Sequence, residues 1–159
     1  MSPTPAAPSD PVRTLIIDDE PLAREHLRSL LSARGDIAVI GECGDGASAI
    51  ARIRAESPEL VLLDVQMPEG GGFDVVRGVG VERMPAVIFV TAYDQHALAA
   101  FEVHAVDYLL KPVNRARFAR AIDRVVRLLR SADGGPSSPA TKPASEPPAL
   151  ARAMEAIDG

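Results

Sequence analysis

The chain has 159 residues, of which 47% are hydrophobic and 25% are charged, which is enough for one folded domain with a sizeable core and terminal tails. Its formal net charge of −5 gives the chain as a whole no electrostatic footprint for nucleic acid, and its single cysteine excludes a disulfide framework. No apolar run approaches the roughly 20 residues that a membrane-spanning helix needs. The N-terminus lacks the basic and apolar regions of a secretory signal, so we expect a cytoplasmic location and no membrane partner.

Composition divides the chain into three parts. Residues 1–11 are rich in Pro, Ser and Ala, and we predict a flexible tail there. Residues 12–131 alternate short apolar runs with helical patterns and form the single predicted domain. Residues 132–159 are again rich in Pro, Ser and Ala, so we interpret them as a linker.

Five apolar segments of the central part predict β-strands. In chain order they are Val12–Asp18, Ile37–Cys43, Glu59–Asp64, Pro85–Thr91 and Val106–Lys111. The central three carry near-continuous apolar runs, which are typical of strands covered on both faces.

Apolar residues at helical spacing follow each predicted strand. They are Leu22, Leu27, Leu30 and Leu31; Ala49, Ile50 and Ile53; Val75, Val76 and Val79; Leu98 and Phe101; and Phe118, Ile122, Val125, Val126 and Leu129. This alternation of strands and helices predicts the α/β class, with a parallel sheet that carries helices on both faces.

Acidic side chains follow the first and third predicted strands. Asp18 and Asp19 come just before Pro21, which is tolerated in the first turn of a helix, and Asp64 ends the third strand. In an open α/β sheet, ligand sites form at this edge. Clustered carboxylates repel one another unless a cation neutralises them, and their oxygens suit Mg²⁺. Asp19 or Asp64 alone would more often cap a helix than bind a metal.

The same edge is expected to carry a hydroxyl and an ammonium group. Thr91 ends the fourth predicted strand and Lys111 ends the fifth. An ammonium can neutralise phosphoryl oxygens, and a hydroxyl can donate a hydrogen bond to one. A nucleophile, a metal and charge neutralisation are what phosphoryl transfer requires.

Four segments, matched in order and spacing, resemble the receiver domains of response regulators. They are LIIDDEPLAREHLRSLL, LVLLDVQMPEGGG, VIFVTAY and DYLLKPV, and the resemblance covers the region from about Arg13 to Arg130. The resemblance implies a flavodoxin-like (βα)5 doubly wound sheet with strand order 2-1-3-4-5. It also implies a signalling switch that a sensor histidine kinase phosphorylates, rather than an enzyme that turns over an external substrate.

The resemblance assigns a phosphoacceptor and a metal site. Asp64 matches the phosphoacceptor, and Asp18 and Asp19 match the acidic pair of the family. Asp19 and Asp64 would bind Mg²⁺ directly, Asp18 through water, and Gln66 through its backbone carbonyl.

The resemblance also assigns a switch. Thr91 and Lys111 match the residues that hold the phosphoryl group, and Tyr108 matches the aromatic residue that moves inward when Thr91 shifts. The bond between Lys111 and Pro112 is expected to be a cis-proline bond.

A narrower resemblance concerns the output of the switch. The segment YDQHALAAFEVHAVDYLLKP is similar to receivers attached to LytTR-type DNA-binding domains. Such a domain would follow the linker, so either this sequence is part of a longer transcription regulator or the protein is a stand-alone receiver. DNA binding would then belong to an output domain outside this chain.

Other interpretations stay open at this point. The arginines of the last predicted helix form either a solvated face, with pairs such as Asp123 to Arg127, or a homodimer surface with the fourth helix and fifth strand. A phosphohydrolase with an aspartyl nucleophile is a second functional class, although its pattern needs an acid where this chain has Gln66. A third class is an interaction module that is never phosphorylated.

Overall fold

The computed structural model describes residues 10–68, 71–92 and 105–134. The elements in chain order are β1 (Val12–Ile17), α1 (Pro21–Ser32), β2 (Ile37–Cys43), α2 (Gly46–Glu56), β3 (Leu60–Leu63), α3 (Gly72–Val79), the short 3₁₀ helix η2 (Val81–Arg83), β4 (Ala86–Thr91), β5 (Asp107–Leu110) and α5 (Arg115–Gly134). The predicted helix around Leu98 and Phe101 lies outside the described residues. Nothing in the described part of the chain is a helix long and apolar enough to cross a membrane.

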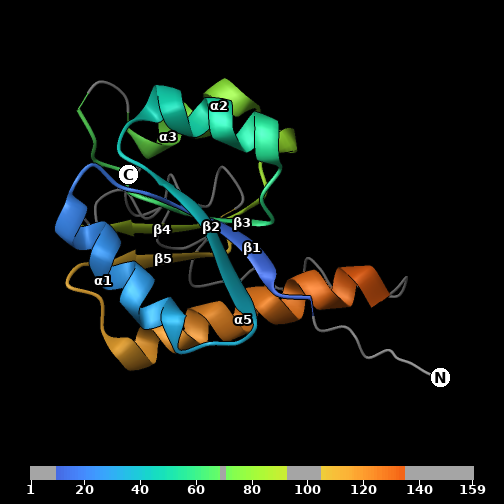
Figure 1. The fold of residues 1–159 in the computed structure, drawn as a ribbon. Coiled ribbons are helices and arrows are strands. Elements are labelled where there is room, and N and C mark those ends of the chain that lie inside the picture. The colour runs from blue at the N-terminus through green and yellow to red at the C-terminus, as the bar shows by residue number, and fades with distance from the viewer. Residues whose placement is uncertain (1–9, 69–70, 93–104, 135–159) are drawn as a thin grey trace, which may run out of the picture.

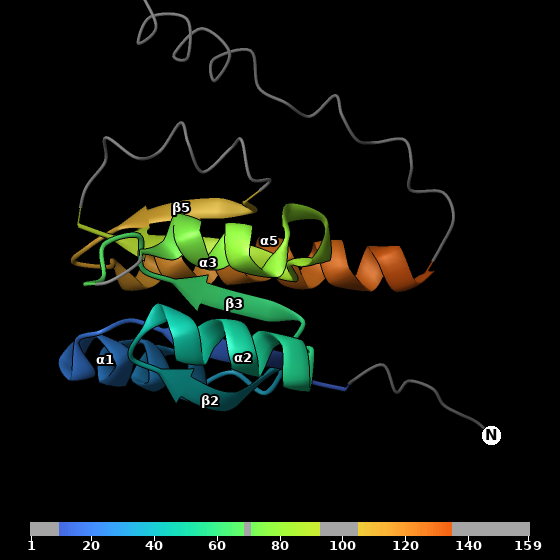
Figure 2. The same ribbon diagram turned by 90° about the horizontal axis from the view of Figure 1, so that it is seen from above.

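The five strands form one parallel sheet in the order β2-β1-β3-β4-β5, as predicted. Figure 1 shows α2 and α3 on one face of the sheet and α1 and α5 on the other. In Figure 2, seen from above, α2 and α3 lie nearest the viewer, and α1 and α5 lie behind them. The fold is therefore the predicted flavodoxin-like doubly wound sheet.

Each strand contributes to two separate cores because successive side chains of a strand point to opposite faces. Ile16 and Leu62 pack with α1 and α5, whereas Leu15 and Leu63 pack with α2 and α3. All four side chains are fully buried. This burial on both faces explains why the strand segments are continuously apolar.

The helices that the structure describes bury the predicted faces, with one exception. Leu27, Leu30 and Leu31 of α1 are buried, but Leu22 is 78% exposed, so its assignment to that face was wrong. At 3.6 residues per turn, Leu22 lies about 140° around the helix from Leu27 and points to solvent. The prediction thus extended the buried face of α1 one turn too far toward the start of the helix.

The last helix differs from the prediction at its surface. Asp123 accepts a hydrogen bond from Arg34 Nη2 at 2.7 Å, and no pair between Asp123 and Arg127 occurs among the ion pairs of the described residues. Arg34 also binds Asp36, so it links the turn before β2 to α5. The helix continues to Gly134, beyond the expected start of the linker at residue 132.

Candidate functional site

The ends of β1 and β3 bring two aspartates together. The two strands are neighbours, with Ile17 paired to Leu63, so the residues that follow them leave the sheet at the same edge. The backbone N–H of Asp64 donates to the carbonyl of Ile17 at 3.0 Å, and that of Asp18 donates to Cys43 at 3.0 Å. Pro21 begins α1 directly after this turn, and its fixed φ suits the first turn of a helix.

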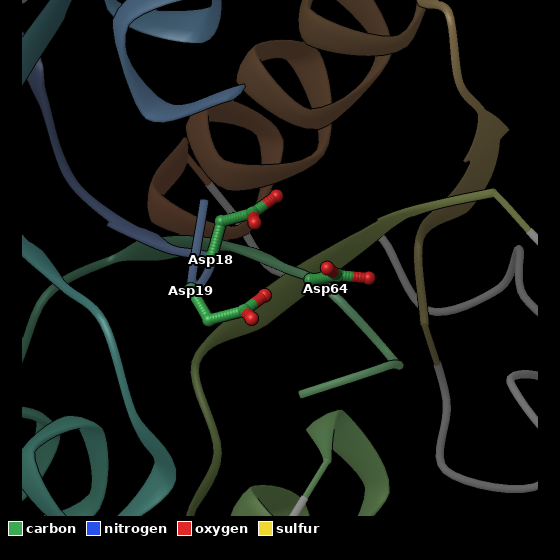
Figure 3. A group of neighbouring side chains, drawn as sticks. All are labelled: Asp18, Asp19 and Asp64. Atoms are coloured by element: carbon green, nitrogen blue, oxygen red, sulfur yellow. The ribbon is translucent and has the colours of Figure 1, made fainter. Parts of the chain in front are cut away.

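Asp18, Asp19 and Asp64 form a compact acidic cluster. Each offers one carboxylate oxygen, and these three atoms lie within 4.8 Å of one another. Figure 3 shows the three side chains next to one another, two from the turn after β1 and one from the end of β3. Asp18 is 1% exposed and Asp64 is 4% exposed. A set of hard oxygen donors around one point fits a divalent cation such as Mg²⁺.

Lys111 provides the positive charge of the site. Its Nζ lies 2.8 Å from Asp18 Oδ2 and 3.4 Å from Asp64 Oδ2, and it also lies 3.6 Å from Glu20 Oε1. The backbone N–H of Lys111 donates to the carbonyl of Thr91 at 2.7 Å, which holds the end of β5 beside the end of β4. The bond between Lys111 and Pro112 is cis.

Burial and charge set the protonation of the two central groups. Burial, together with the negative charge of Asp18, raises the pKa of Asp64 to about 6. Burial on its own would lower the pKa of Lys111, but hydrogen bonds and charge from Asp18 and Asp64 outweigh it, and the pKa lies above its ordinary value. The ammonium is therefore fully charged at neutral pH, while Asp64 keeps its proton more readily than a solvated aspartate.

The remaining predicted site residues lie on neighbouring elements. The N–H of Gln66 donates to Asp64 Oδ1 at 3.1 Å, and the side chain of Gln66 is exposed. Thr91 is fully buried at the end of β4. Tyr108 is half-buried on β5, opposite Phe89 of β4, and the two ring centroids are 6.3 Å apart. The sheet thus gathers the acids, the ammonium and Thr91 at one edge and places Tyr108 on β5, which β4 separates from β3.

Sequence reasoning missed one residue at this site. Arg24 of α1 donates from Nη1 to the main-chain carbonyl of Asp18 at 2.6 Å. The only signal in the sequence is its spacing, because it stands four residues after Glu20 on the helix that leaves the acidic turn. Such spacing is common, so it does not by itself point to a contact with the site.

Comparison with known proteins identifies the family of this chain. The family model of the response regulator receiver domain matches residues 14–123 of this chain. The transcriptional regulatory protein BtsR of Salmonella typhi is 43% identical over 114 residues, which cover 72% of this chain and 48% of that protein. A response regulatory protein of Vibrio cholerae is 45% identical over 129 residues, which cover 81% of this chain and 53% of that protein. This chain thus spans about half the length of these curated relatives.

Solved structures share the fold. The response regulatory domain of protein mrkE from Klebsiella pneumoniae matches with a TM-score of 0.70 and 25% identity, over 75% of this chain and 98% of that one. The signal receiver domain of NarL from Mycobacterium tuberculosis matches with a TM-score of 0.63 and 34% identity, over 79% of this chain and 99% of that one. The chain therefore belongs to the response regulator receiver domain family and carries the receiver domain of a two-component response regulator.

Proposed function

We propose that Asp64 is the phosphoacceptor of this receiver domain. The observation that supports this proposal is the buried carboxylate of Asp64, 4% exposed, with two further aspartates and the Lys111 ammonium around it. A Mg²⁺ ion held by Asp19 and Asp64, by the backbone carbonyl of Gln66 and by Asp18 through water would neutralise charge on the phosphoryl oxygens. Receiver domains in general bind Mg²⁺ at such an acidic pocket.

The proposed reaction is transfer of a phosphoryl group from a phosphohistidine of a sensor kinase. A carboxylate oxygen of Asp64 attacks phosphorus, the bond from phosphorus to nitrogen breaks, and the imidazole keeps the electron pair. Lys111 and Thr91 then hold oxygens of the acyl phosphate, Lys111 by charge and Thr91 by a hydrogen bond. Their place at the ends of β5 and β4, next to the acids, supports these roles.

The aspartyl phosphate would shift a pre-existing equilibrium between inactive and active conformations. We assign Thr91 and Tyr108 as the coupling pair because the strands that carry them are neighbours. An active form could pair as a homodimer through the fourth helix, β5 and α5, although the fourth helix lies outside the described residues. The domain is a switch in the cytoplasm and not an enzyme for an external substrate.

We propose regulation of transcription as the output. The relatives named transcriptional regulatory proteins are about twice as long as the matched region. An output domain of LytTR type beyond residue 159, connected by the linker at residues 132–159, would supply the DNA binding, since the net charge of this chain is −5. The reading frame downstream of Gly159 tests this: a LytTR-like domain supports the proposal, and a stop codon contradicts it.

Phosphorylation of the purified chain tests the role of Asp64. We expect acetyl phosphate to label the chain only with Mg²⁺ present, and Asp64→Asn to abolish the label. Asp74→Asn, an exposed aspartate paired with Arg77 on α3, is the matched control and should be labelled like the wild type. Beryllofluoride, which mimics a phosphoryl group, should bind together with Mg²⁺.

The outcome also separates the alternatives. Undiminished labelling of Asp64→Asn would contradict the assignment of the acceptor. Absence of any Mg²⁺-dependent change would instead favour an interaction module that is never phosphorylated. Turnover of a small phosphomonoester would favour a phosphohydrolase.

A further inference from the structure

We propose that Arg24 is a positioning residue for the acidic site. It would act by holding the peptide unit between Asp18 and Asp19, and so keep both carboxylates oriented toward a shared cation. This inference rests on the proposed function, because it concerns the Mg²⁺ that these residues would hold.

Arg24 connects three elements around the site. It lies in α1, its Nη1 donates to the carbonyl of Asp18 at 2.6 Å, and its Nε donates to Glu42 Oε1 of β2 at 3.2 Å. The side chains of Arg24 and Glu42 are 21% and 25% exposed, so the pair is mostly shielded from water. Glu42 thereby orients the planar guanidinium, and the fork geometry of arginine allows both contacts at once.

Arg24 holds one of the two main-chain polar groups of Asp18 in the acidic turn. The N–H of Asp18 donates to Cys43, so β2 already holds that end of the residue. The carbonyl of Asp18, which belongs to the same peptide unit as the nitrogen of Asp19, is held by Arg24. The side chain of Asp18 is held as well, by the N–H of Glu20 at 2.9 Å and by Lys111. Without Arg24, the peptide that leads into Asp19 would lose its hydrogen-bond donor.

The packing leaves room for the guanidinium at this place. Gly44 follows β2, and a Cβ built there would lie 3.3 Å from Arg24 Nη1 and 4.0 Å from the carbonyl of Asp18. A side chain at position 44 would therefore crowd the guanidinium, so the glycine leaves space for the contact between Arg24 and Asp18.

The neighbouring Arg28 provides a comparison within the same helix. Arg28 Nη1 binds the other oxygen of Glu42, and its side chain is 48% exposed. Among the hydrogen bonds of the described residues, it makes none to Asp18. Arg24 and Arg28 thus carry the same charge and bind the same carboxylate, that of Glu42. They differ in the contact with the acidic turn.

The direction in which the Mg²⁺ affinity changes distinguishes a positioning role of Arg24 from an effect of its charge. A cation beside a metal site repels the metal, so loss of the Arg24 charge alone would tighten Mg²⁺ binding. Loss of the positioning contact would weaken it instead. Removal of a residue that orients metal ligands typically lowers metal affinity by about 10-fold or more.

Calorimetric titration of the purified chain with Mg²⁺ tests the inference. We expect Arg24→Gln to bind Mg²⁺ on the order of tenfold more weakly than the wild type. Arg24→Lys, which keeps the charge but lacks the fork, should bind with intermediate affinity, and Arg28→Gln should bind like the wild type or slightly more tightly. Circular dichroism of each variant checks that it is folded.

Hydrogen exchange supplies a readout that does not need the metal. The N–H of Glu20 donates to Asp18 Oδ1, so a loosened turn should speed exchange of this amide in Arg24→Gln. The amide of Ala49, which donates to Asp45 at the start of α2, should exchange unchanged.

The outcomes distinguish the two proposals. If the wild type binds Mg²⁺ and Arg24→Gln binds it equally or more tightly, the inference is wrong and the proposed function stands. Equal weakening in Arg28→Gln would overturn it too, because the effect would then belong to Glu42 and the packing of α1 on β2. If the wild type binds no Mg²⁺, both fail.

Discussion

The side chain of Asp64 is buried, yet the site needs the negative charge of its carboxylate at neutral pH. It is 4% exposed, and its pKa rises from 3.8 to about 6 through burial first and the charge of Asp18 second, even though Lys111 Nζ lies 3.4 Å away. The Lys111 ammonium is shared among the carboxylates of Asp18, Glu20 and Asp64, so it offsets only part of their repulsion. A metal ion would offset the rest of the repulsion. Such a cluster therefore favours binding of a cation, whereas without a cation it lowers the stability of the fold.

This pKa predicts how stability depends on pH in the absence of metal. Because the pKa of Asp64 is higher in the folded state, its contribution to stability is fully present below about 3.8 and is lost as the pH rises through about 6. Between pH 5 and pH 7.5 in EDTA, the wild type should lose about 1 kcal/mol more unfolding free energy than Asp64→Asn does. Urea unfolding monitored by circular dichroism at both pH values checks this. Parallel losses in the two proteins would contradict the shifted pKa.

At the scale of elements, the site depends on how closely α3 approaches the end of β3. Gly72 begins α3, and its N–H donates to the carbonyl of Val65 at 3.0 Å. A Cβ built on Gly72 would lie 2.6 Å from the carbonyl oxygen of Asp64 and 3.1 Å from side-chain atoms of Leu63 and Phe89. Only glycine allows this approach, so the helix and the acceptor strand would have to separate to admit any side chain.

We therefore expect Gly72→Ala to destabilise the fold and disturb the site together. The added methyl group should lower the unfolding free energy by roughly 1–3 kcal/mol, as overpacking does, and should weaken Mg²⁺ binding by shifting the main chain of Asp64. Gly35→Ala is the matched control because a Cβ there meets nothing within 4 Å. Chemical denaturation and calorimetric titration of both variants measure the two effects. Equal stability of the two variants would show that α3 moves away without cost.

At the scale of the whole molecule, the described part is one sheet with a core on each face and the acidic site at its carboxyl edge. The arrangement explains how residues far apart in sequence meet: Lys111 and Asp18 are 93 positions apart and are joined by a 2.8 Å contact. Burial of the strands on both faces holds the edge in place, and the loops beyond it carry the chemistry.

The same arrangement predicts that the domain works without the C-terminal part of the chain. Within the part of the chain that the structure describes, both cores and all site residues lie between Val12 and Gly134. A chain that stops after Gly134 should therefore unfold at the same temperature as the full chain, within about 2 °C, and bind Mg²⁺ with the same affinity, because residues 135–159 have the Pro-, Ser- and Ala-rich composition of a linker. Differential scanning calorimetry and Mg²⁺ titration of the two proteins check this. A large loss of either would place part of the folded unit within residues 135–159.

Local sequence patterns predicted most of the fold. The bounds of β2 agree with the prediction, and the other four predicted strands contain the observed ones with at most one or two extra residues. The surplus residues, such as Asp18 and Asp64, stand at strand ends, where pairing with the neighbouring strand decides the boundary and no local pattern records it. Leu22 was misassigned for a related reason: apolar character alone does not tell which side of a helix the core covers.

By itself, the sequence determined the class of fold, the strand segments, and the acids, hydroxyl and ammonium that follow them, because residue type and spacing are local properties of the chain. Only the tertiary structure decided which of these groups come into contact. The 2.8 Å bond of Lys111 to Asp18, the raised pKa of Asp64 and the hold of Arg24 on a main-chain carbonyl all depend on distances and burial between separate elements. Such distances follow from packing of the whole sheet and its helices, which no single segment of sequence encodes.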